Sequence, residues 1–231
     1  INEQVALRHA AAAENGPQVI YCSPYQGVLV TRYLEGRHWS EAEAGSELNI
    51  ERLALLLKRV HALPGTGKQL IPGDVVARYL RGIKDHFVVI PERFNALQAK
   101  MEQVIYQLSH HRGERRLCHN DPVLGNIIDC GDKLLLIDWE YAAMGDPFFD
   151  LAVVVHNLKF NERQLQQLLE TYLGRLDETA HRWFLYNYAS YIYIDMLWYW
   201  FQSAAAPRCG YGTIAEGKLD TLVAILHELG L

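Results

Sequence analysis

The chain has 231 residues, 50% of them hydrophobic, and its 22 basic and 27 acidic side chains give a net charge of −5. This composition predicts one or two globular domains with an ample core and excludes a disordered chain. No basic run exceeds the pair Arg115-Arg116, which excludes the electrostatic footprint of a nucleic-acid-binding protein.

The first half of the chain is expected to open with a helix and two strands. The Ala-rich residues 2–14 predict a helix that ends near Gly16, and they lack the basic start and long apolar core of a signal peptide. The segments VIYC and GVLVTRYL are typical of two strands joined by the turn SPYQG. From about Glu41 the apolar spacing becomes helical and predicts two core-facing stripes. These stripes are Leu53, Leu56, Leu57 and Val60, and then Leu97, Met101, Val104 and Leu108.

The second half is expected to contain a β-hairpin followed by helices. NIIDCGDKLLLIDWE combines two β-branched and leucine-rich runs around the turn CGDK. After it the pattern is helical to the end, with breaks near Gly174 and at APRCGYG. The most apolar stretch, YASYIYIDMLWYWF, contains Asp195 and is short for a bilayer span, so no membrane segment is predicted. The cysteines have no paired spacing, which predicts neither a zinc site nor disulfides and makes a reducing cytoplasm the expected location.

A group of polar side chains stands between apolar residues in LCHNDPVLGNII, residues 117–128. Buried polar groups cost free energy unless they find partners, so these side chains are candidates for a function. If the hairpin has a short loop, strand pairing brings Asn126 opposite Ile137 or Asp138, beside Asp121. Two carboxylates and an amide oxygen form the hard-oxygen set that Mg²⁺ prefers.

This oxygen cluster fits phosphoryl transfer, because Mg²⁺ in such a site usually brings a nucleotide with it. The reaction needs a metal to neutralise charge on the β and γ phosphates and a carboxylate to orient the attacking hydroxyl. Asp121 can be that carboxylate, and Asn126 and Asp138 can be the metal ligands. Each residue taken alone is also an ordinary turn or cap residue. The coincidence of spacing, hairpin and order favours the catalytic interpretation.

The segment HNDPVLGNII, followed by LLLIDWEYAAMGDPFFDLA, resembles the choline and ethanolamine kinase, thiamine kinase and aminoglycoside phosphotransferase superfamily. Within it, bacterial choline kinase-like proteins are the closest resemblance. The family pattern H-x-D-x-x-x-x-N is matched by His119, Asp121 and Asn126, and the pattern I-D-[WF]-E-Y is matched by residues 137–141. The resemblance implies an α+β, protein-kinase-like fold of two lobes.

The resemblance also implies roles for individual residues. Asp121 would be the catalytic base, and Asn126 and Asp138 would bind Mg²⁺. His119 and Asp150 would support the catalytic loop rather than take part in the chemistry.

The beginning of the chain lacks the glycine-rich loop and the strand lysine with which this family holds the ATP phosphates. PGTGKQ, residues 64–69, lacks the spacing of a P-loop and is interpreted as an ordinary loop. Residues 1–34 resemble the family's αC-like helix, the next two strands and the hinge. We therefore expect a remnant of the N-terminal lobe there, with the first strands missing or disordered. Residues 35–231 are expected to form the largely helical C-terminal lobe, which is catalytic and binds the substrate.

By the same resemblance, Glu3 matches the glutamate that pairs with the strand lysine, which would lie upstream of Ile1. The adenine would stack near the hinge and bond its backbone. This implies nucleotide contacts at Arg32, Tyr33 and Leu34.

The last third of the chain carries most of the aromatic residues, and helical spacing puts Trp198 and Phe201 on one face with Asp195 nearby. Aromatic faces beside a carboxylate suit an ammonium group, each cation-π contact contributing roughly 0.5 to 2 kcal/mol. Choline kinases resemble this arrangement, although such a stripe is about equally often core. Glu140 and Tyr141 are further candidates for substrate contact, and Glu140 could instead support the metal ligands.

We therefore expect an ATP- and Mg²⁺-dependent phosphotransferase that acts on the primary alcohol of a small cationic metabolite, with choline as the first choice. Thiamine would fit the same residues, whereas an aminoglycoside fits less well because the acidic residues after Asp150 are scattered. A non-catalytic binding protein for cationic metabolites is the alternative of another class, and retention of Asp121, Asn126 and Asp138 argues against it. The sequence leaves the oligomeric state open.

Overall fold

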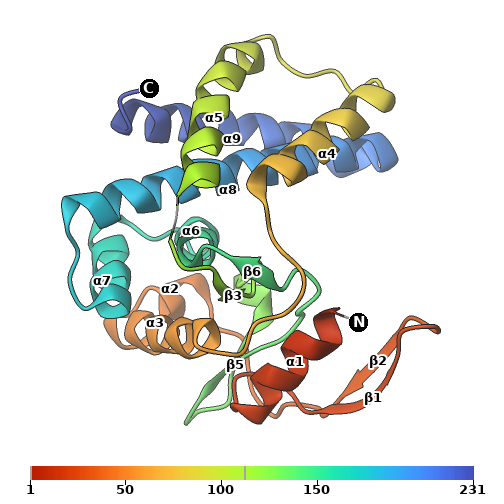
Figure 1. The fold of residues 1–231 in the computed structure, drawn as a ribbon, viewed down its shortest axis with the longest axis vertical. Coiled ribbons are helices and arrows are strands. Elements are labelled where there is room, and N and C mark those ends of the chain that lie inside the picture. The colour runs from red at the N-terminus through yellow and green to blue at the C-terminus, as the bar shows by residue number, and fades with distance from the viewer. Residues whose placement is uncertain (1, 112) are drawn as a thin grey trace. The chain divides into compact units, whose positions relative to one another are not determined.

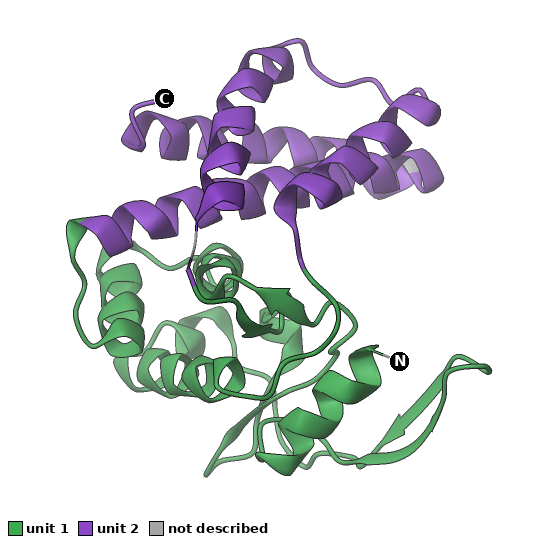
Figure 2. Cartoon of the chain, in the orientation of Figure 1, with its two compact units in different colours: residues 1–69, 114–178 green, residues 70–113, 179–231 purple. Residues whose placement is uncertain are grey.

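The structure, a computed structural model, describes residues 2–111 and 113–231 (Figure 1). The chain divides into two compact units, each discontinuous in sequence (Figure 2). Unit 1 comprises residues 1–69 and 114–178, and unit 2 comprises residues 70–113 and 179–231. The predicted boundary near residue 34 concerns the lobes of the fold rather than these units, and it stays a prediction.

Unit 1 combines helices with three antiparallel strand pairs. Its helices are α1 (Asn2–Ala12), α2 (Glu41–Ala44), α3 (Glu47–His61), α6 (Pro147–Asn157) and α7 (Glu162–Leu173), with a 3-10 turn η1 (Leu124–Asn126). The paired strands are β1 (Val19–Ser23) with β2 (Val28–Thr31), β3 (Arg116–Cys118) with β6 (Ala143–Gly145), and β4 (Ile127–Asp129) with β5 (Leu134–Leu136). The predicted opening helix and two strands are confirmed, although the second strand is shorter than expected.

Capping residues fix where several helices of unit 1 begin and end. Ser40 and Glu43 form a capping box at α2, and Asn161 and Gln164 form another at α7. Such an N-cap contributes about 1 kcal/mol, because it satisfies backbone donors that the first turn leaves unpaired. Helix α7 ends at Gly174, whose φ of +83° is left-handed and carries no Cβ penalty in glycine. The predicted break near Gly174 is confirmed.

The core of unit 1 lies where α3 packs against α7, β3 and β5. The predicted stripe of α3 is fully buried there, and α7 contributes Leu168 and Leu169 to the same core. The buried members of the α3 stripe are Leu53, Leu56, Leu57 and Val60. Because fully burying one such side chain contributes about 1.5 to 3 kcal/mol, this contact is a main source of the unit's stability.

The predicted hairpin is formed by β4 and β5, in which Ile127 pairs with Leu136. Just beyond the strands, the backbone N–H of Ile137 donates to the carbonyl oxygen of Asn126 at 3.0 Å. Asn126 therefore lies opposite Ile137, which is one of the two predicted registers. This pairing sets the relation between the two ends of the hairpin on which the site depends.

Asp129, at the end of β4, anchors the hairpin to the rest of the unit. Its carboxylate accepts two hydrogen bonds from Arg52, at 3.0 and 2.8 Å, and one from Nε1 of Trp39 at 2.7 Å. The hydrogen bonds from Arg52 hold the pKa of Asp129 well below its usual range. Such charge-assisted hydrogen bonds are stronger than neutral ones, so they hold the hairpin firmly against Trp39 and Arg52.

The pairing of β3 with β6 is a feature that sequence analysis missed. Leu117 pairs with Met144, and each strand has only three residues. A strand of this length is too short to show the alternation of apolar and polar residues by which strands are recognised in a sequence. The pair connects the start of the HNDP segment to the segment that follows the IDWEY motif.

Unit 2 is helical. Its elements are α4 (Pro72–Asp85), α5 (Arg93–His110), α8 (Glu178–Ala205, whose first residue belongs to unit 1), η2 (Pro207–Cys209) and α9 (Tyr211–Glu228). Leu97, Met101 and Val104 of the predicted α5 stripe are buried, and Leu108 is half-buried. The break predicted at APRCGYG is confirmed by η2 and by Gly210, which has a φ of +70°.

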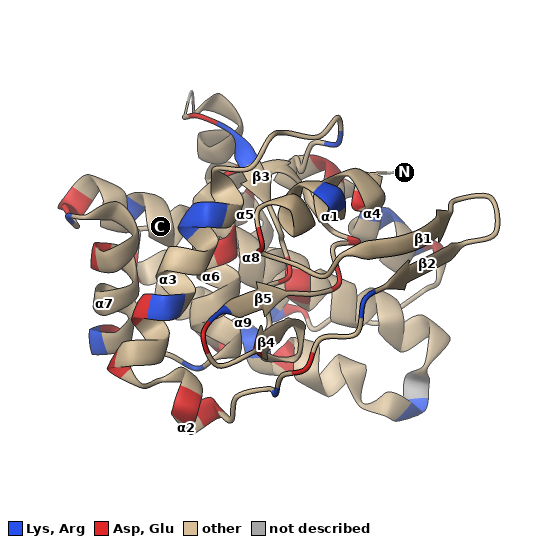
Figure 3. Cartoon of the chain, turned by 90° about the horizontal axis from the view of Figure 1, so that it is seen from below, with Lys and Arg blue, Asp and Glu red and all other residues tan. Residues whose placement is uncertain are grey.

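Two further observations concern charge and hydropathy. Acidic and basic positions are interspersed along α3 and α7 (Figure 3). Within residues 2–111 and 113–231, no helix combines the length and the apolar character that a membrane span requires.

Candidate active site

A buried carboxylate, Asp150 in the first turn of α6, is the centre of the candidate site. Asp146 caps this helix by accepting the N–H of Phe148 at 2.9 Å, which fixes the first turn. Asp150 accepts the backbone N–H groups of His119 at 2.8 Å and Asn120 at 2.7 Å. These charge-assisted bonds hold the backbone at the beginning of the HNDP segment.

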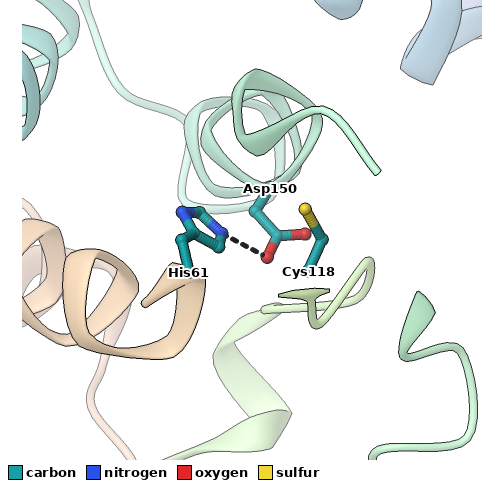
Figure 4. A group of neighbouring side chains, drawn as sticks. All are labelled: His61, Cys118 and Asp150. Atoms are coloured by element: carbon teal, nitrogen blue, oxygen red, sulfur yellow. Dashed lines mark hydrogen bonds and ion pairs between the residues drawn. The ribbon is translucent and has the colours of Figure 1, made fainter. Parts of the chain in front are cut away.

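His61, the last residue of α3, provides a third donor to this carboxylate. Its Nε2 donates to Asp150 at 3.0 Å (Figure 4), and its Nδ1 lies 2.7 Å from the hydroxyl of Tyr172 in α7. Both His61 and Asp150 are buried. Side chains from α3, α6 and α7 thus meet at the point that holds the loop.

The thiol of Cys118 completes a group of possible metal ligands with His61 and Asp150, since their ligand atoms lie within 4.8 Å of one another (Figure 4). Burial raises the pKa of Cys118 well above its usual value, so the thiol stays protonated and is a poor ligand. The carboxylate of Asp150 is already engaged by three donors. We therefore interpret the group as a structural network.

The backbone turns sharply at Asn120, which has a left-handed φ of +66°. Asparagine tolerates this conformation better than most residues. Its amide nitrogen donates to the carbonyl oxygens of Tyr141 at 3.0 Å and Cys118 at 3.4 Å. The turn is therefore fixed from three directions, because Asp150 holds the backbone N–H of the same residue.

His119 connects the loop to the end of β5. Its ring is fully buried, and burial lowers its pKa, so the ring is neutral. Nε2 donates to the carbonyl oxygen of Ile137 at 2.9 Å, and the ring meets Trp139 edge to face with centroids 4.8 Å apart. These contacts fit the supporting role that the family resemblance implies for His119, and that role stays a proposal.

Asp121 and Asn126 lie in contact, as their spacing predicts. The amide nitrogen of Asn126 donates to the carbonyl oxygen of Asp121 at 2.9 Å and to its carboxylate at 3.0 Å. The turn η1 produces this approach, because it shortens the path between the two residues. The amide nitrogen faces Asp121, so the amide oxygen is the atom that Asn126 would offer to a cation.

Asp138 follows Ile137 and carries an exposed side chain on a left-handed backbone, with a φ of +60°. Its negative charge acts on Glu3, in the first turn of α1, together with that of Glu140. Burial raises the pKa of Glu3, and the charges of Asp138 and Glu140 raise it further, whereas Lys68 lowers it. Carboxylates that repel one another in this way favour a bound cation.

The residues predicted to contact the nucleotide follow β2. The backbone N–H of Arg32 donates to the carbonyl oxygen of Gln18 at 2.8 Å. Arg32 and Tyr33 are exposed, and Leu34 is half-buried. Their contact with adenine stays a prediction.

Asp195, predicted as a substrate contact, has a cationic partner within unit 2. Lys218 of α9 forms an ion pair with it at 2.7 Å, and the ammonium lies 5.3 Å from the ring centroid of Tyr199. Burial raises the pKa of Asp195, while Lys218 and a hydrogen bond from Tyr191 lower it. The carboxylate thus neutralises a lysine of the same unit.

The two aromatic candidates on α8 differ in their surroundings. Phe201 packs between Tyr79 and His86, with ring centroids 5.9 and 5.8 Å away. This packing favours the core interpretation for Phe201. Trp198 is half-buried, and its ring meets the ring of Tyr199 edge to face with centroids 4.9 Å apart. Contact of either side chain with a substrate stays a prediction, as it does for Glu140 and Tyr141 in unit 1.

Sequence reasoning missed two residues that the structure brings to the site. His61 bonds to Asp150, and nothing in its sequence context distinguishes it from an ordinary helix end. Lys68 lies in PGTGKQ, a segment that the sequence predicts to be an ordinary loop, yet its ammonium donates to the carbonyl oxygen of Glu140 at 3.0 Å. Both contacts join residues far apart in the chain, which no local pattern reveals.

Comparison with known proteins identifies relatives over most of the chain. A family model described as "Phosphotransferase enzyme family" matches residues 2–184. Protein LicA of Haemophilus influenzae is 26% identical over 220 residues, which cover 88% of this chain and 79% of LicA. The structure of a choline/ethanolamine kinase family protein from Mesorhizobium loti matches with a TM-score of 0.91 and 26% identity, over 99% of this chain and 81% of that one. Choline kinase LicA from Streptococcus pneumoniae matches with a TM-score of 0.82 and 20% identity, over 98% and 80% of the two chains.

Proposed function

The chain belongs to the phosphotransferase enzyme family and is a small-molecule kinase of α+β, kinase-like fold, and from this premise we propose that it phosphorylates choline with ATP. The proposed reaction transfers the γ-phosphoryl group to the primary alcohol of the substrate. Choline is preferred because a relative with 26% identity is described as a choline/ethanolamine kinase family protein.

The observation that carries the proposal is the contact between Asn126 and Asp121. Asp121 carries a half-buried carboxylate, and Asn126 lies opposite Ile137, the residue that precedes Asp138. This arrangement supports the proposed grouping of the three residues. In the proposed mechanism Asp121 accepts a hydrogen bond from the substrate hydroxyl and orients its oxygen towards the γ phosphate. The hydrogen bonds that Asp150 accepts from the backbone N–H groups of His119 and Asn120 would keep Asp121 in place.

The donor set of this site fits a magnesium ion. Asn126 has its amide oxygen to offer, and Asp138 has an exposed carboxylate on the neighbouring segment. These two side chains would hold Mg²⁺, which when bound would neutralise the charge that develops on the phosphates. The charges of Asp138 and Glu140 both act on Glu3, so a cation near these carboxylates would be favoured. Adenine contacts at Arg32, Tyr33 and Leu34 complete the proposed nucleotide site.

For the ammonium group of choline we propose Trp198. Phe201, the other member of the predicted aromatic pair, packs between Tyr79 and His86, whereas Trp198 is half-buried and meets the ring of Tyr199 edge to face. An indole face attracts a quaternary ammonium through its quadrupole. Asp195 is less suited, because it already pairs with Lys218.

The test is a measurement of ADP release from MgATP with choline, ethanolamine, thiamine and an aminoglycoside. We expect choline to give the highest kcat/KM. Asp121→Ala should lower kcat by several orders of magnitude with little change in KM, because its carboxylate acts mainly in the transition state.

Asp132→Ala is the matched control, since it removes an exposed carboxylate from the turn of the same hairpin. It should retain full activity. Equal kcat values for the Asp121 and Asp132 variants would refute the role of Asp121. If thiamine or an aminoglycoside gives the highest kcat/KM, the proposed phosphoryl transfer stands, but choline is not the substrate.

A further inference from the structure

The loop that contains Lys68 is fixed against β6. The backbone N–H of Met144 donates to the carbonyl oxygen of Lys68 at 2.8 Å, and Gln69 forms a parallel β-bridge with Met144. The N–H of Thr66 lies 3.4 Å from the sulfur of Met144. The PGTGKQ segment is therefore held in register with a strand of unit 1, which places the lysine beside the IDWEY motif.

From this position the ammonium of Lys68 donates to the carbonyl oxygen of Glu140 at 3.0 Å. Three residues before Glu140, the carbonyl oxygen of Ile137 accepts a hydrogen bond from Nε2 of His119 at 2.9 Å. Asp138 thus lies between two carbonyl groups, each bonded to a side chain from a distant part of the chain.

The backbone of Asp138 needs such support. Its φ of +60° is left-handed, a conformation that is unfavourable for an L-residue because Cβ approaches the following carbonyl oxygen. A residue keeps this conformation only where its surroundings impose it. The bond from Lys68 is one of the contacts that hold the segment on the C-terminal side of Asp138.

Lys68 also lies among negative charges. Its charge acts on Glu3 together with the opposing charges of Asp138 and Glu140. The lysine therefore has two possible effects on a cation at Asp138. It can orient the carboxylate, and it can repel the cation.

We propose that Lys68 is a positioning residue for Asp138, which it holds in the conformation that binds Mg²⁺. This inference rests on the proposed function, because Asp138 is a metal ligand only in that proposal. Orientation of Asp138 by the lysine and repulsion of the cation by its charge predict opposite changes in Mg²⁺ affinity when the lysine is removed. Loss of orientation weakens Mg²⁺ binding, whereas loss of a nearby positive charge strengthens it.

The experiment compares Lys68→Met, Lys68→Arg and the unchanged chain. Calorimetric titration of Mg²⁺ in the presence of ADP measures the metal affinity without turnover. We expect Lys68→Met to weaken Mg²⁺ binding about 10-fold or more, the effect typical of residues that orient metal ligands. At saturating Mg²⁺ most of kcat should return. Lys68→Arg should restore most of the affinity, because a guanidinium can donate to the same carbonyl oxygen.

Lys159→Met is the matched control, since it removes an exposed lysine of unit 1 that bonds to Glu41 at 2.7 Å. It should leave Mg²⁺ binding unchanged. Thermal unfolding without metal checks that each variant is folded.

Unchanged or tighter Mg²⁺ binding by Lys68→Met would overturn the inference, as would a failure of Lys68→Arg to restore it. Asp138→Asn separates this failure from that of the proposed function. If Asp138→Asn loses the metal and Lys68→Met keeps it, only the role of Lys68 is refuted. If the unchanged chain binds no Mg²⁺ with ADP, both proposals are refuted.

Discussion

The carboxylate of Asp150 accepts the backbone N–H of Asn120 at 2.7 Å, although the two residues are 30 positions apart in the chain. The same carboxylate accepts the N–H of His119 and a ring nitrogen of His61. A buried charge is tolerated only when it is fully hydrogen-bonded, and here three donors meet that requirement. The stability of unit 1 and the geometry of its loop therefore depend on one side chain.

Replacement of Asp150 should destabilise the chain strongly. Asp150→Ala leaves two buried backbone donors without an acceptor, and each such group costs about 1 to 3 kcal/mol. We expect the free energy of unfolding, measured with urea, to fall by about 3 kcal/mol. Asp146→Ala in the same helix should cost only about 1 kcal/mol, because it removes a single cap. Equal losses in the two variants would contradict the role of Asp150.

The ion pair of Asp129 with Arg52 should make stability depend on pH in the acid range. The pKa of Asp129 is lower in the folded chain than its usual value of 3.8, so its contribution is present above that pH. It is lost as the pH falls from 3.8 towards the folded value. At pH 7 Asp129→Asn should lower the free energy of unfolding by about 1.5 to 3 kcal/mol, the range for hydrogen bonds to charged groups.

The measurement is urea unfolding of the unchanged chain and of Asp129→Asn from neutral pH down to acid pH. The difference between them should shrink as the pH drops below 3.8. Asp132→Asn, an exposed position in the same turn, should differ little from the unchanged chain at any pH. A difference for Asp129→Asn that is independent of pH would show that the ion pair does not contribute.

The packing of Phe201 against α4 can be tested at Gly82. A Cβ atom at this position would lie 2.5 Å from Cε2 of Phe201, so Gly82→Ala forces the ring to move. We expect a loss of about 1 to 3 kcal/mol, as for other overpacked sites. A Cβ atom added at Gly217 in α9 would have no neighbouring atom within 4 Å. Gly217→Ala should therefore stabilise the helix by about 0.5 to 1 kcal/mol.

Thermal unfolding of both variants, of Phe201→Ala, and of Gly82→Ala combined with Phe201→Ala decides the point. If the ring causes the loss, the double variant should be more stable than the sum of the single losses predicts. Additive losses of stability would show that the ring of Phe201 does not contact a side chain at position 82.

The proposed contact of Trp198 with the ammonium group predicts a selective change in KM. Trp198→Ala removes a cation-π contact of about 0.5 to 2 kcal/mol, so KM for choline should rise roughly 2- to 30-fold. KM for ATP should not change. Trp183→Ala is the control, because Trp183 lies in the same helix and stacks on His111. An unchanged KM for choline would contradict this contact and favour the interpretation of Trp198 as a packing residue.

Some features of this protein could be predicted from the sequence because they depend on neighbours in the chain. The stripe of α3 follows from helical periodicity, and it is buried as predicted. The hairpin register follows from a short turn between two apolar runs, and it places Asn126 opposite Ile137. The motif spacing led to the family that the comparisons establish.

Other features were decided only by the tertiary structure, because they depend on contacts between distant segments. His61 meets Asp150 across 89 positions, and Lys68 meets Glu140 across 72. Asp195 forms an ion pair with Lys218 of another helix, which the spacing within α8 does not reveal, and its contact with a substrate stays a prediction. A local pattern shows that a polar residue needs a partner, since an unpaired buried group is costly, but only the folded chain shows which partner it finds.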